Sequence, residues 1–343
     1  MSELRQNLIT RDWVIVATER AKRPDEFTQQ NKCVTHTPAY RPRCPFCLGN
    51  EDASEVELYR QGDQHSWKVR SVLNKFPALS TVGEIDIKVE GIYRSMNGFG
   101  IHEVLIEHPR HNVTTALLDI NDVADILRAY RQRYAEIRKD PRIKTITIFK
   151  NHGERAGTSL EHPHSQIAAT PIVPSQIRNR IAEAMRFIDD TGECLFCRTL
   201  KDELTDFRRI VVESEHFVAF IPYAALSPFH TWIFGRRHTS SFDDITDVEI
   251  VDLAYNLKTV LAKLYYGLNN PDYNYTIRSI PTDERFTDYF HWYIAIVPRL
   301  SHIAGFELGS GIYINTVTPE DSAAFLRRVQ IPEIQLIESE TEG

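Results

Sequence analysis

The stretch Cys44-Pro45-Phe46-Cys47 recurs in the second half of the chain as Cys194-Leu195-Phe196-Cys197. Further features follow each copy in the same order. An apolar run ends in Arg110-His111 after the first copy and in Arg237-His238 after the second, and each is followed by a helical pattern, a β-rich run and a histidine segment. Because so many ordered matches are hard to obtain by chance, we interpret the chain as a tandem repeat.

The two helical patterns each carry one apolar face. The first is expected to begin near Asn121, a good N-cap residue, and the second at Thr246, where Glu249 completes a capping-box pattern. Both have apolar residues at helical spacing. These residues are Val123, Ile126, Leu127, Tyr130, Tyr134 and Ile137 in the first helix, and Ile250, Leu253, Leu257, Val260, Leu261 and Leu264 in the second.

The alternation of strand-like runs with single helices predicts the fold class. Runs at 144–150 and 275–280 follow the helices, and the strand pairs are short and hairpin-like. We therefore predict an α+β fold with mainly antiparallel sheets and flanking helices. A helix-like stretch from Gln176 precedes the second cysteine pair, which places the boundary near residue 185, between an N-terminal catalytic half (1–185) and a C-terminal half (186–343).

Length and charge limit the class of protein. A chain of 343 residues can build two substantial cores. Its formal net charge is -7, whereas nucleic-acid binders are usually basic, so we expect no nucleic-acid partner. No apolar run approaches the roughly 20 residues that cross a bilayer, and Met1–Asn7 lacks the apolar segment of a secretory signal. We expect no membrane partner and a cytoplasmic location.

Each half offers two cysteines and two histidines, the four ligands of a closed zinc site. Without a signal peptide, Cys-x-x-Cys favours metal over a disulfide, and the matching histidines argue against a thioredoxin-like redox role. His111 is preferred to His102 and His108 because its repeat counterpart is His238. The sequence therefore predicts two zinc ions per chain. The ligand sets are Cys44, Cys47, His111 and His162, and Cys194, Cys197, His238 and His291.

The segment His162-Pro163-His164-Ser165-Gln166 is expected to carry the chemistry. Pro163 favours an extended conformation at His162, and alternate residues of an extended segment share a face. With His162 fixed by zinc, a neutral His164 can attack the α-phosphorus of a nucleotide through Nε2. Gln166, on the same face, can donate a hydrogen bond to the phosphate.

Further donors are expected from the segment Asn151–Ser159, whose glycines allow close approach of the backbone to a phosphate. It is not a P-loop, because no Gly-Lys-Ser/Thr follows. In the second half, Tyr293 stands where the first half has His164. That half keeps its metal set but lacks a nucleophile, so we predict one reactive centre per chain.

These motifs resemble the galactose-1-phosphate uridylyltransferase family, within the histidine-triad superfamily. His162–Gln166 is similar to its His-Pro-His-x-Gln motif, Asp12–Val16 and Arg20–Pro24 to its N-terminal signature, and Gly305–Asn315 to a run late in its sequence. The resemblance implies two tandem histidine-triad-like halves, a homodimer with sites near the subunit interface, and ping-pong transfer of UMP from UDP-glucose through His164 to a hexose 1-phosphate. It also implies nucleotide-sugar contacts from Lys22, Arg23, Asn74, Asn151, Gly157, Thr158, Ser159 and Gln166, and hexose contacts from Phe306 and Glu307.

Some residues depart from that pattern. Ser165 stands where many uridylyltransferases have glycine, and Lys75 where some have aspartate. ADP-glucose phosphorylase, a relative with two such zinc sites, resembles this chain in Ser165-Gln166 and His291-Trp292, whereas Pro163 favours the uridylyltransferase. In that alternative, the histidine carries AMP and inorganic phosphate is the acceptor. A further alternative is a non-catalytic zinc module that binds nucleotides or nucleic acid.

Overall fold

The structure is a computed structural model that describes residues 2–17, 27 and 37–332. Its helices are α1 (Ile120–Ile137), α2 (Ser175–Thr191), α3 (Leu195–Asp206), α4 (Asp247–Gly267), α5 (Gly305–Ser310) and α6 (Pro319–Arg328), with short 3-10 helices η3 (Glu51–Ala53), η4 (Glu154–Ala156) and η5 (Phe242–Asp244). Its strands are β1 (Glu3–Gln6), β2 (Trp13–Val16), β3 (Glu57–Gln61), β4 (Val69–Leu73), β5 (Ile87–Glu90), β6 (Tyr93–Met96), β7 (Ile101–Ile106), β8 (Thr145–His152), β9 (His164–Thr170), β10 (Ile210–Glu213), β11 (Phe217–Phe220), β12 (Thr231–Gly235), β13 (Tyr273–Arg278), β14 (Tyr293–Pro298) and β15 (Tyr313–Asn315).

One sheet runs through both halves of the chain. Its strand order is β10-β11-β12-β14-β13-β8-β9-β7-β4-β3, and neighbouring strands are antiparallel. Read outward from the centre, the first half contributes β8-β9-β7-β4-β3 and the second β13-β14-β12-β11-β10. The same strand order therefore occurs twice, joined edge to edge at β8 and β13. This arrangement confirms the predicted α+β fold with mainly antiparallel pairing.

The two faces of the sheet have different chemistry, as β13 shows. Tyr273, Tyr275 and Ile277 are buried, whereas the intervening residues, such as Asn274 and Arg278, are only partly buried. Successive side chains of a strand point to opposite faces, so the first set lies on the apolar side of the sheet and the second on the polar side. The polar face is the one that carries the chemistry described below.

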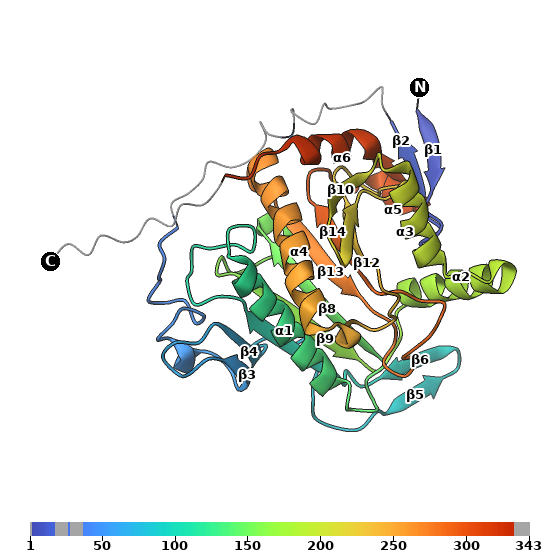
Figure 1. The fold of residues 1–343 in the computed structure, drawn as a ribbon. Coiled ribbons are helices and arrows are strands. Elements are labelled where there is room, and N and C mark those ends of the chain that lie inside the picture. The colour runs from blue at the N-terminus through green and yellow to red at the C-terminus, as the bar shows by residue number, and fades with distance from the viewer. Residues whose placement is uncertain (1, 18–26, 28–36, 333–343) are drawn as a thin grey trace.

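Helices α1 and α4 lie side by side over the apolar face (Figure 1). Every residue of the two predicted apolar stripes belongs to this core, and each large aliphatic side chain buried there contributes about 1.5–3 kcal/mol. The capping box of α4 is confirmed, because Glu249 and Thr246 exchange hydrogen bonds. The predicted N-cap of α1 is wrong: Asp119 is the extended residue before the helix, and Asn121 lies inside the first turn.

The other face is polar at β13 but not throughout: over the second half of the sheet, α2 and α3 cover it with an apolar cluster in which Phe196 packs among Phe234, Phe290 and Tyr293. Helix α2 is longer than expected and continues to Gly192, whose left-handed conformation ends it. Residue 185 therefore lies within α2, and the division into 1–185 and 186–343 remains a prediction. Within the described residues, no helix has both the length and the apolar character needed to span a membrane.

A small separate sheet joins two strands from the beginning of the chain to β15, a strand late in the sequence. Strand β2, which contains Trp13–Val16 of the N-terminal signature, pairs antiparallel with β1 and parallel with β15 from the late run. Asn315, at the end of β15, donates its side-chain amide to the Ala225 carbonyl at 2.9 Å. The N-terminal strands thus pack on the second half of the repeat, although they precede the first.

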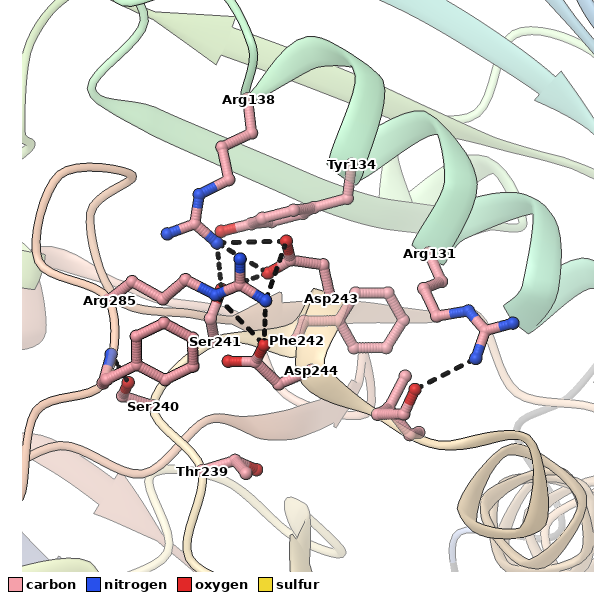
Figure 2. Close-up of polar contacts among 12 residues, drawn as sticks. Arg131, Tyr134, Arg138, Thr239, Ser240, Ser241, Phe242, Asp243, Asp244 and Arg285 are labelled. Carbon is pink, nitrogen blue, oxygen red and sulfur yellow. Dashed lines mark hydrogen bonds and ion pairs between the residues drawn. The ribbon is translucent and has the colours of Figure 1, made fainter.

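Polar contacts hold α1 of the first half to η5 of the second (Figure 2). Arg138 donates to both carboxylate oxygens of Asp243, at 2.8 and 3.0 Å, and to the Thr282 carbonyl at 2.9 Å. The Tyr134 hydroxyl donates to Ser279 at 3.0 Å. The side chains of Arg138 and Asp243 are 12% and 5% exposed, so this ion pair is shielded from solvent.

Replacing Arg138 by methionine is expected to lower the free energy of unfolding by about 3 kcal/mol, because it leaves the buried Asp243 carboxylate without its main partner. Arg131 provides the control on the same helix. Its partner Asp247 is 74% exposed, so Arg131→Met should cost no more than about 1 kcal/mol. Urea denaturation of the two variants measures both values, and equal losses would contradict the importance of the buried pair.

Candidate active site

Four predicted metal ligands meet at the first-half edge of the polar face. Cys44, Cys47, His111 and His162 are all buried, and their ligand atoms lie within 4.8 Å of one another. Sγ of Cys47 is 3.5 Å from Nδ1 of His111 and 3.6 Å from Nδ1 of His162, and the two histidine nitrogens are 3.3 Å apart. The choice of His111 over its rivals agrees with this geometry: the His108 carbonyl instead lies 2.8 Å from His162 Nε2.

These distances fit a zinc ion. Zinc–sulfur bonds of about 2.3 Å and zinc–nitrogen bonds of about 2.0–2.1 Å give tetrahedron edges of about 3.3–3.8 Å. The Cys44 Sγ to His162 Nδ1 distance of 3.6 Å falls in the same range. Two thiols and two imidazoles, buried and aimed at one point, are also the ligand types that zinc prefers.

The second ligand set is less compact. Cys194, Cys197 and His238 lie within 4.8 Å of one another. His291 adds its Nδ1 at 3.6 Å from Cys197 Sγ, and its ring lies 5.4 Å from that of His238. The structure thus brings three of the four predicted ligands into one cluster and places the fourth beside Cys197.

His164 begins β9 immediately after this Cys/His cluster. Its Nδ1 lies 2.8 Å from the carbonyl oxygen of His162, which fixes the ring and leaves Nδ1 as the donor. Phe46, from between the two cysteines, packs against the His164 ring with centroids 5.7 Å apart. No hydrogen bond to Nε2 of His164 is found among the described residues, so this nitrogen is left for a ligand. Burial is the largest effect on the pKa of His164 and lowers it, which keeps the ring neutral and nucleophilic.

Gln166 lies on the same face of β9 and is oriented by a residue that the sequence did not single out for this role. Nε2 of His102 is 2.8 Å from Gln166 Oε1, and Nδ1 of His102 accepts from the Ala78 N–H at 3.2 Å. His102 therefore donates to Gln166 through Nε2, so the free end of the Gln166 amide is its NH₂ group. Asn74 approaches the same His102 Nε2 to 3.2 Å, which places it behind Gln166.

A cavity of about 520 Å³ opens beside His164. Its lining includes Asn151, Thr158 and Ser159 of the predicted phosphate-binding segment. Asn151 Oδ1 accepts from Asn274 at 2.7 Å, which leaves the Asn151 amide NH₂ available as a donor. Three predicted substrate contacts therefore share one cavity with the proposed nucleophile.

The turn within this segment depends on Gly153. Its φ is +84°, and an added Cβ would lie 2.0 Å from the carboxylate of Asp272, so no other residue fits there. The same carboxylate accepts from the Arg155 N–H at 2.7 Å. Gly157, with φ +90°, ends η4 directly before Thr158 but does not itself line the cavity. Asp272 belongs to the second half, which thereby shapes the site of the first.

A buried ion pair lies close to the reactive histidine. Lys150 and Glu107 are each 1% exposed and form a salt bridge, and Lys150 also lines the cavity. Glu107 accepts in addition from the Thr115 hydroxyl at 3.2 Å and from Tyr130 at 3.4 Å. Nothing in the local sequence distinguishes these residues from ordinary strand residues, and their pairing appears only in the folded chain.

The remaining predicted contacts are not brought to this cavity. Phe306 and Glu307 lie in α5, where the Phe306 side chain is exposed and Glu307 accepts from the Ala304 N–H at 3.0 Å. Neither lines the cavity, and neither do Asn74 and Gln166. Lys22 and Arg23 lie outside the described residues.

The second half repeats the geometry without the nucleophile. Ile106 of β7 pairs with His164, and Phe234 of β12 pairs with Tyr293 in the same way. Phe196 packs against Tyr293 at 5.9 Å, as Phe46 packs against His164. The register therefore agrees with the predicted correspondence between Tyr293 and His164.

The family model for the galactose-1-phosphate uridyl transferase N-terminal domain matches residues 1–174, and a model for a domain of unknown function (DUF4921) matches residues 118–330. The chain is also 39% identical to ADP-glucose phosphorylase of Arabidopsis thaliana, over 96% of this chain and 93% of that protein. The chain belongs to the galactose-1-phosphate uridylyltransferase family. This family assignment confirms the resemblance found in the sequence motifs.

Other members of the family give the same result. Galactose-1-phosphate uridylyltransferase of Thermotoga maritima is 28% identical, over 96% of this chain and 99% of its own. A crystal structure of an ADP-glucose phosphorylase from Arabidopsis thaliana with bound ADP-glucose superposes with a TM-score of 0.82 at 36% identity, covering 97% of this chain and 100% of that one. These relatives are nucleotidyltransferases, and this member of the family is a nucleotidyltransferase too.

Proposed function

We propose that the chain is a UDP-glucose:hexose-1-phosphate uridylyltransferase that acts through a uridylyl group on Nε2 of His164, with galactose 1-phosphate as the expected acceptor. One observation carries this proposal. The His162 carbonyl engages Nδ1 of His164, so Nε2 faces a cavity that is also lined by polar groups suited to phosphate. An imidazole held in this way is a prepared nucleophile.

The transfer takes two displacements. The Nε2 lone pair attacks the α-phosphorus of the nucleotide sugar, and the bond from that phosphorus to the bridging oxygen breaks, so hexose 1-phosphate leaves with the electron pair. A phosphate oxygen of the second hexose 1-phosphate then attacks the same phosphorus, and the phosphorus–nitrogen bond breaks. Gln166 and Asn151 donate to the phosphoryl oxygens in both steps. Zinc held by Cys44, Cys47, His111 and His162 would fix the backbone that orients His164.

Replacing Gln166 by alanine is expected to lower kcat by about 10²-fold or more, because a donor aimed at the reacting phosphate is lost. Gln166→Glu should be at least as damaging, since it keeps the shape but removes the amide donor and adds negative charge. Steady-state kinetics measure the effect, with Gln176→Ala on the exposed start of α2 as the control. Normal turnover by both Gln166 variants would show that Gln166 does not serve the phosphate.

A second candidate is ADP-glucose phosphorylase, in which His164 carries AMP and inorganic phosphate is the acceptor. The higher identity to that enzyme, 39% against 28%, favours it, whereas Pro163 favours the uridylyltransferase. Ser165 does not bear on the choice. It faces the apolar side of the sheet, where its hydroxyl accepts from Tyr130 at 2.6 Å, and so does not contact the cavity.

Exchange kinetics separate the two candidates. The uridylyltransferase should convert UDP-glucose and galactose 1-phosphate with parallel lines in double-reciprocal plots, and should exchange labelled glucose 1-phosphate into UDP-glucose without any acceptor. The phosphorylase should instead release ADP from ADP-glucose only when phosphate is present. Turnover of ADP-glucose but not of UDP-glucose would overturn the uridylyl assignment. Turnover of neither donor would overturn both candidate functions.

Two zinc ions per chain and a homodimer complete the proposal. The near-tetrahedral first cluster and the three-ligand second cluster support the metal count. The exposure of Ile303, Phe306 and Leu308 on and before α5 supports a subunit contact there. In such a dimer, Phe306 and Glu307 would reach the hexose in the partner's site, while Lys22, Arg23, Asn74, Gly157, Thr158 and Ser159 would serve the nucleotide sugar. Family membership leaves no support for the non-catalytic zinc module.

A further inference from the structure

In the first half, His164, Gln166, Asn151 and His102 form the reactive row on one face of the sheet. The second half carries a counterpart of this row, with different side chains. His102 lies four residues before Ile106, the strand partner of His164. His230 lies four residues before Phe234, the strand partner of Tyr293. His230 therefore takes the place of His102, just as Tyr293 takes that of the nucleophile.

The change on the neighbouring strand alters the charge. Arg278 of β13 pairs directly with Tyr293. In the first half, the equivalent residue is Asn151. Phe149 pairs with Gln166, and continuing this register by two residues places Asn151 beside His164. The counterpart of Gln166, two residues after Tyr293, is Ala295. The second half thus replaces an amide by a guanidinium and a large polar side chain by a methyl group.

Two more cations gather around His230. Burial lowers the pKa of His230 to about 3, and the positive charges of Arg278, Arg180 and Arg299 add to this effect. Within the described part of the chain, these three guanidinium groups form no ion pair with a carboxylate, and Nε of Arg180 is buried without a hydrogen-bond partner. The cluster therefore combines several cations with no anion to balance them.

His230 adds a directed donor. It is 4% exposed, and its Nε2 accepts from Trp232 Nε1 at 3.1 Å, so a neutral ring carries its proton on Nδ1. That Nδ1 is buried and has no hydrogen-bond partner in the described residues. A buried donor without an acceptor is destabilising unless a ligand satisfies it, and arginines pair best with phosphate or carboxylate oxygens.

We propose that Arg180, Arg278 and His230 form a second binding site, for a phosphate group of inorganic phosphate or of a small phosphomonoester. The ligand binds there without reacting, because Tyr293 occupies the nucleophile's place. The site lies on the second half of the sheet: Arg278 lies four residues along β13 from Asn274, which pairs with Asn151, a separation of about 13 Å, and His230 precedes β12, which is separated from β13 by β14.

Equilibrium dialysis with radiolabelled inorganic phosphate tests this site. The zinc-loaded His164→Ala protein, at low ionic strength, removes turnover from the measurement. Adding Arg278→Gln should weaken one phosphate-binding equilibrium by at least about 10-fold, whereas Arg178→Gln on the exposed side of α2 should not. Arg180→Gln is the second variant, and it tests the site independently if Arg278→Gln lowers the melting temperature. It should weaken phosphate binding by a similar factor. Competition with glucose 1-phosphate then distinguishes a phosphomonoester from free phosphate.

Phosphate binding that is unchanged by both Arg278→Gln and Arg180→Gln would overturn the proposal, as would the absence of any saturable binding to the His164→Ala protein. These results are distinguishable from a failure of the proposed function. The uridylyl adduct depends on His164, whereas this site should bind phosphate in a protein that lacks that side chain.

Discussion

Replacing His164 by alanine is expected to lower kcat by more than about 10³-fold, because removal of a covalent nucleophile leaves only binding and electrostatic assistance. The ring is held by the His162 carbonyl and by Phe46. Of the neighbouring imidazoles in the described residues, that of His102 is engaged with Gln166 and that of His162 lies in the Cys/His cluster. Steady-state turnover of the nucleotide sugar with its acceptor measures the loss.

The repeat supplies a matched control. Tyr293 is the counterpart of His164 in the second half, and Tyr293→Phe removes only its hydroxyl while keeping the ring that packs on Phe196. This variant should turn over at a rate close to wild type. Substantial turnover by His164→Ala would contradict the assignment of the nucleophile, and an equally large loss in Tyr293→Phe would contradict the division of roles between the halves.

The Cys44→Ser protein is expected to lose one zinc ion per chain and about 5 kcal/mol or more of unfolding free energy. Structural zinc supplies about 10–16 kcal/mol in small zinc-dependent domains, so its loss should be strongly destabilising. The cysteines also belong to a small core with Trp67, Val72 and Ile106, which should loosen when the metal is lost. Turnover should fall as well, since His162 provides the carbonyl that orients His164.

The second cluster gives the comparison. Cys197→Ser should also lose one zinc ion, but it should affect turnover less, because its cluster supports Tyr293 rather than a nucleophile. Elemental analysis of zinc, denaturation and kinetics on the two variants measure these effects. A Cys44→Ser protein that keeps full zinc content and full activity would show that the first cluster is not a metal site.

The repeat made much of the fold predictable. Apolar residues at helical spacing identified both central helices, and Thr246 with Glu249 located the start of α4, because these signals are local. The order of cysteine pair, helix and histidine segment in each half also anticipated the matching strand orders. The preference for His111 over His108 rested on that symmetry alone, and the structure places His111 in the cluster.

Other features depend on contacts between distant segments and leave no local signal. His102 of β7 orients Gln166 of the neighbouring strand β9, and Asp272 of the second half shapes the turn at Gly153 in the first. Asn121 looked like an N-cap by residue type, but the backbone turns at Asp119. Phe306 and Glu307 lie on α5, which has no buried residue and does not line the cavity, and the motif itself gives no signal of that position.

The most direct test of the central claim is intact-protein mass spectrometry after brief incubation with UDP-glucose, without acceptor, and in parallel with ADP-glucose. The predicted result is an increment equal to UMP less one water on the wild-type protein, absent from His164→Ala and removed by galactose 1-phosphate. An AMP-sized increment from ADP-glucose would keep the covalent histidine and select the phosphorylase. No increment with either donor, or an increment that survives in His164→Ala, would contradict a nucleotidyl group carried by His164.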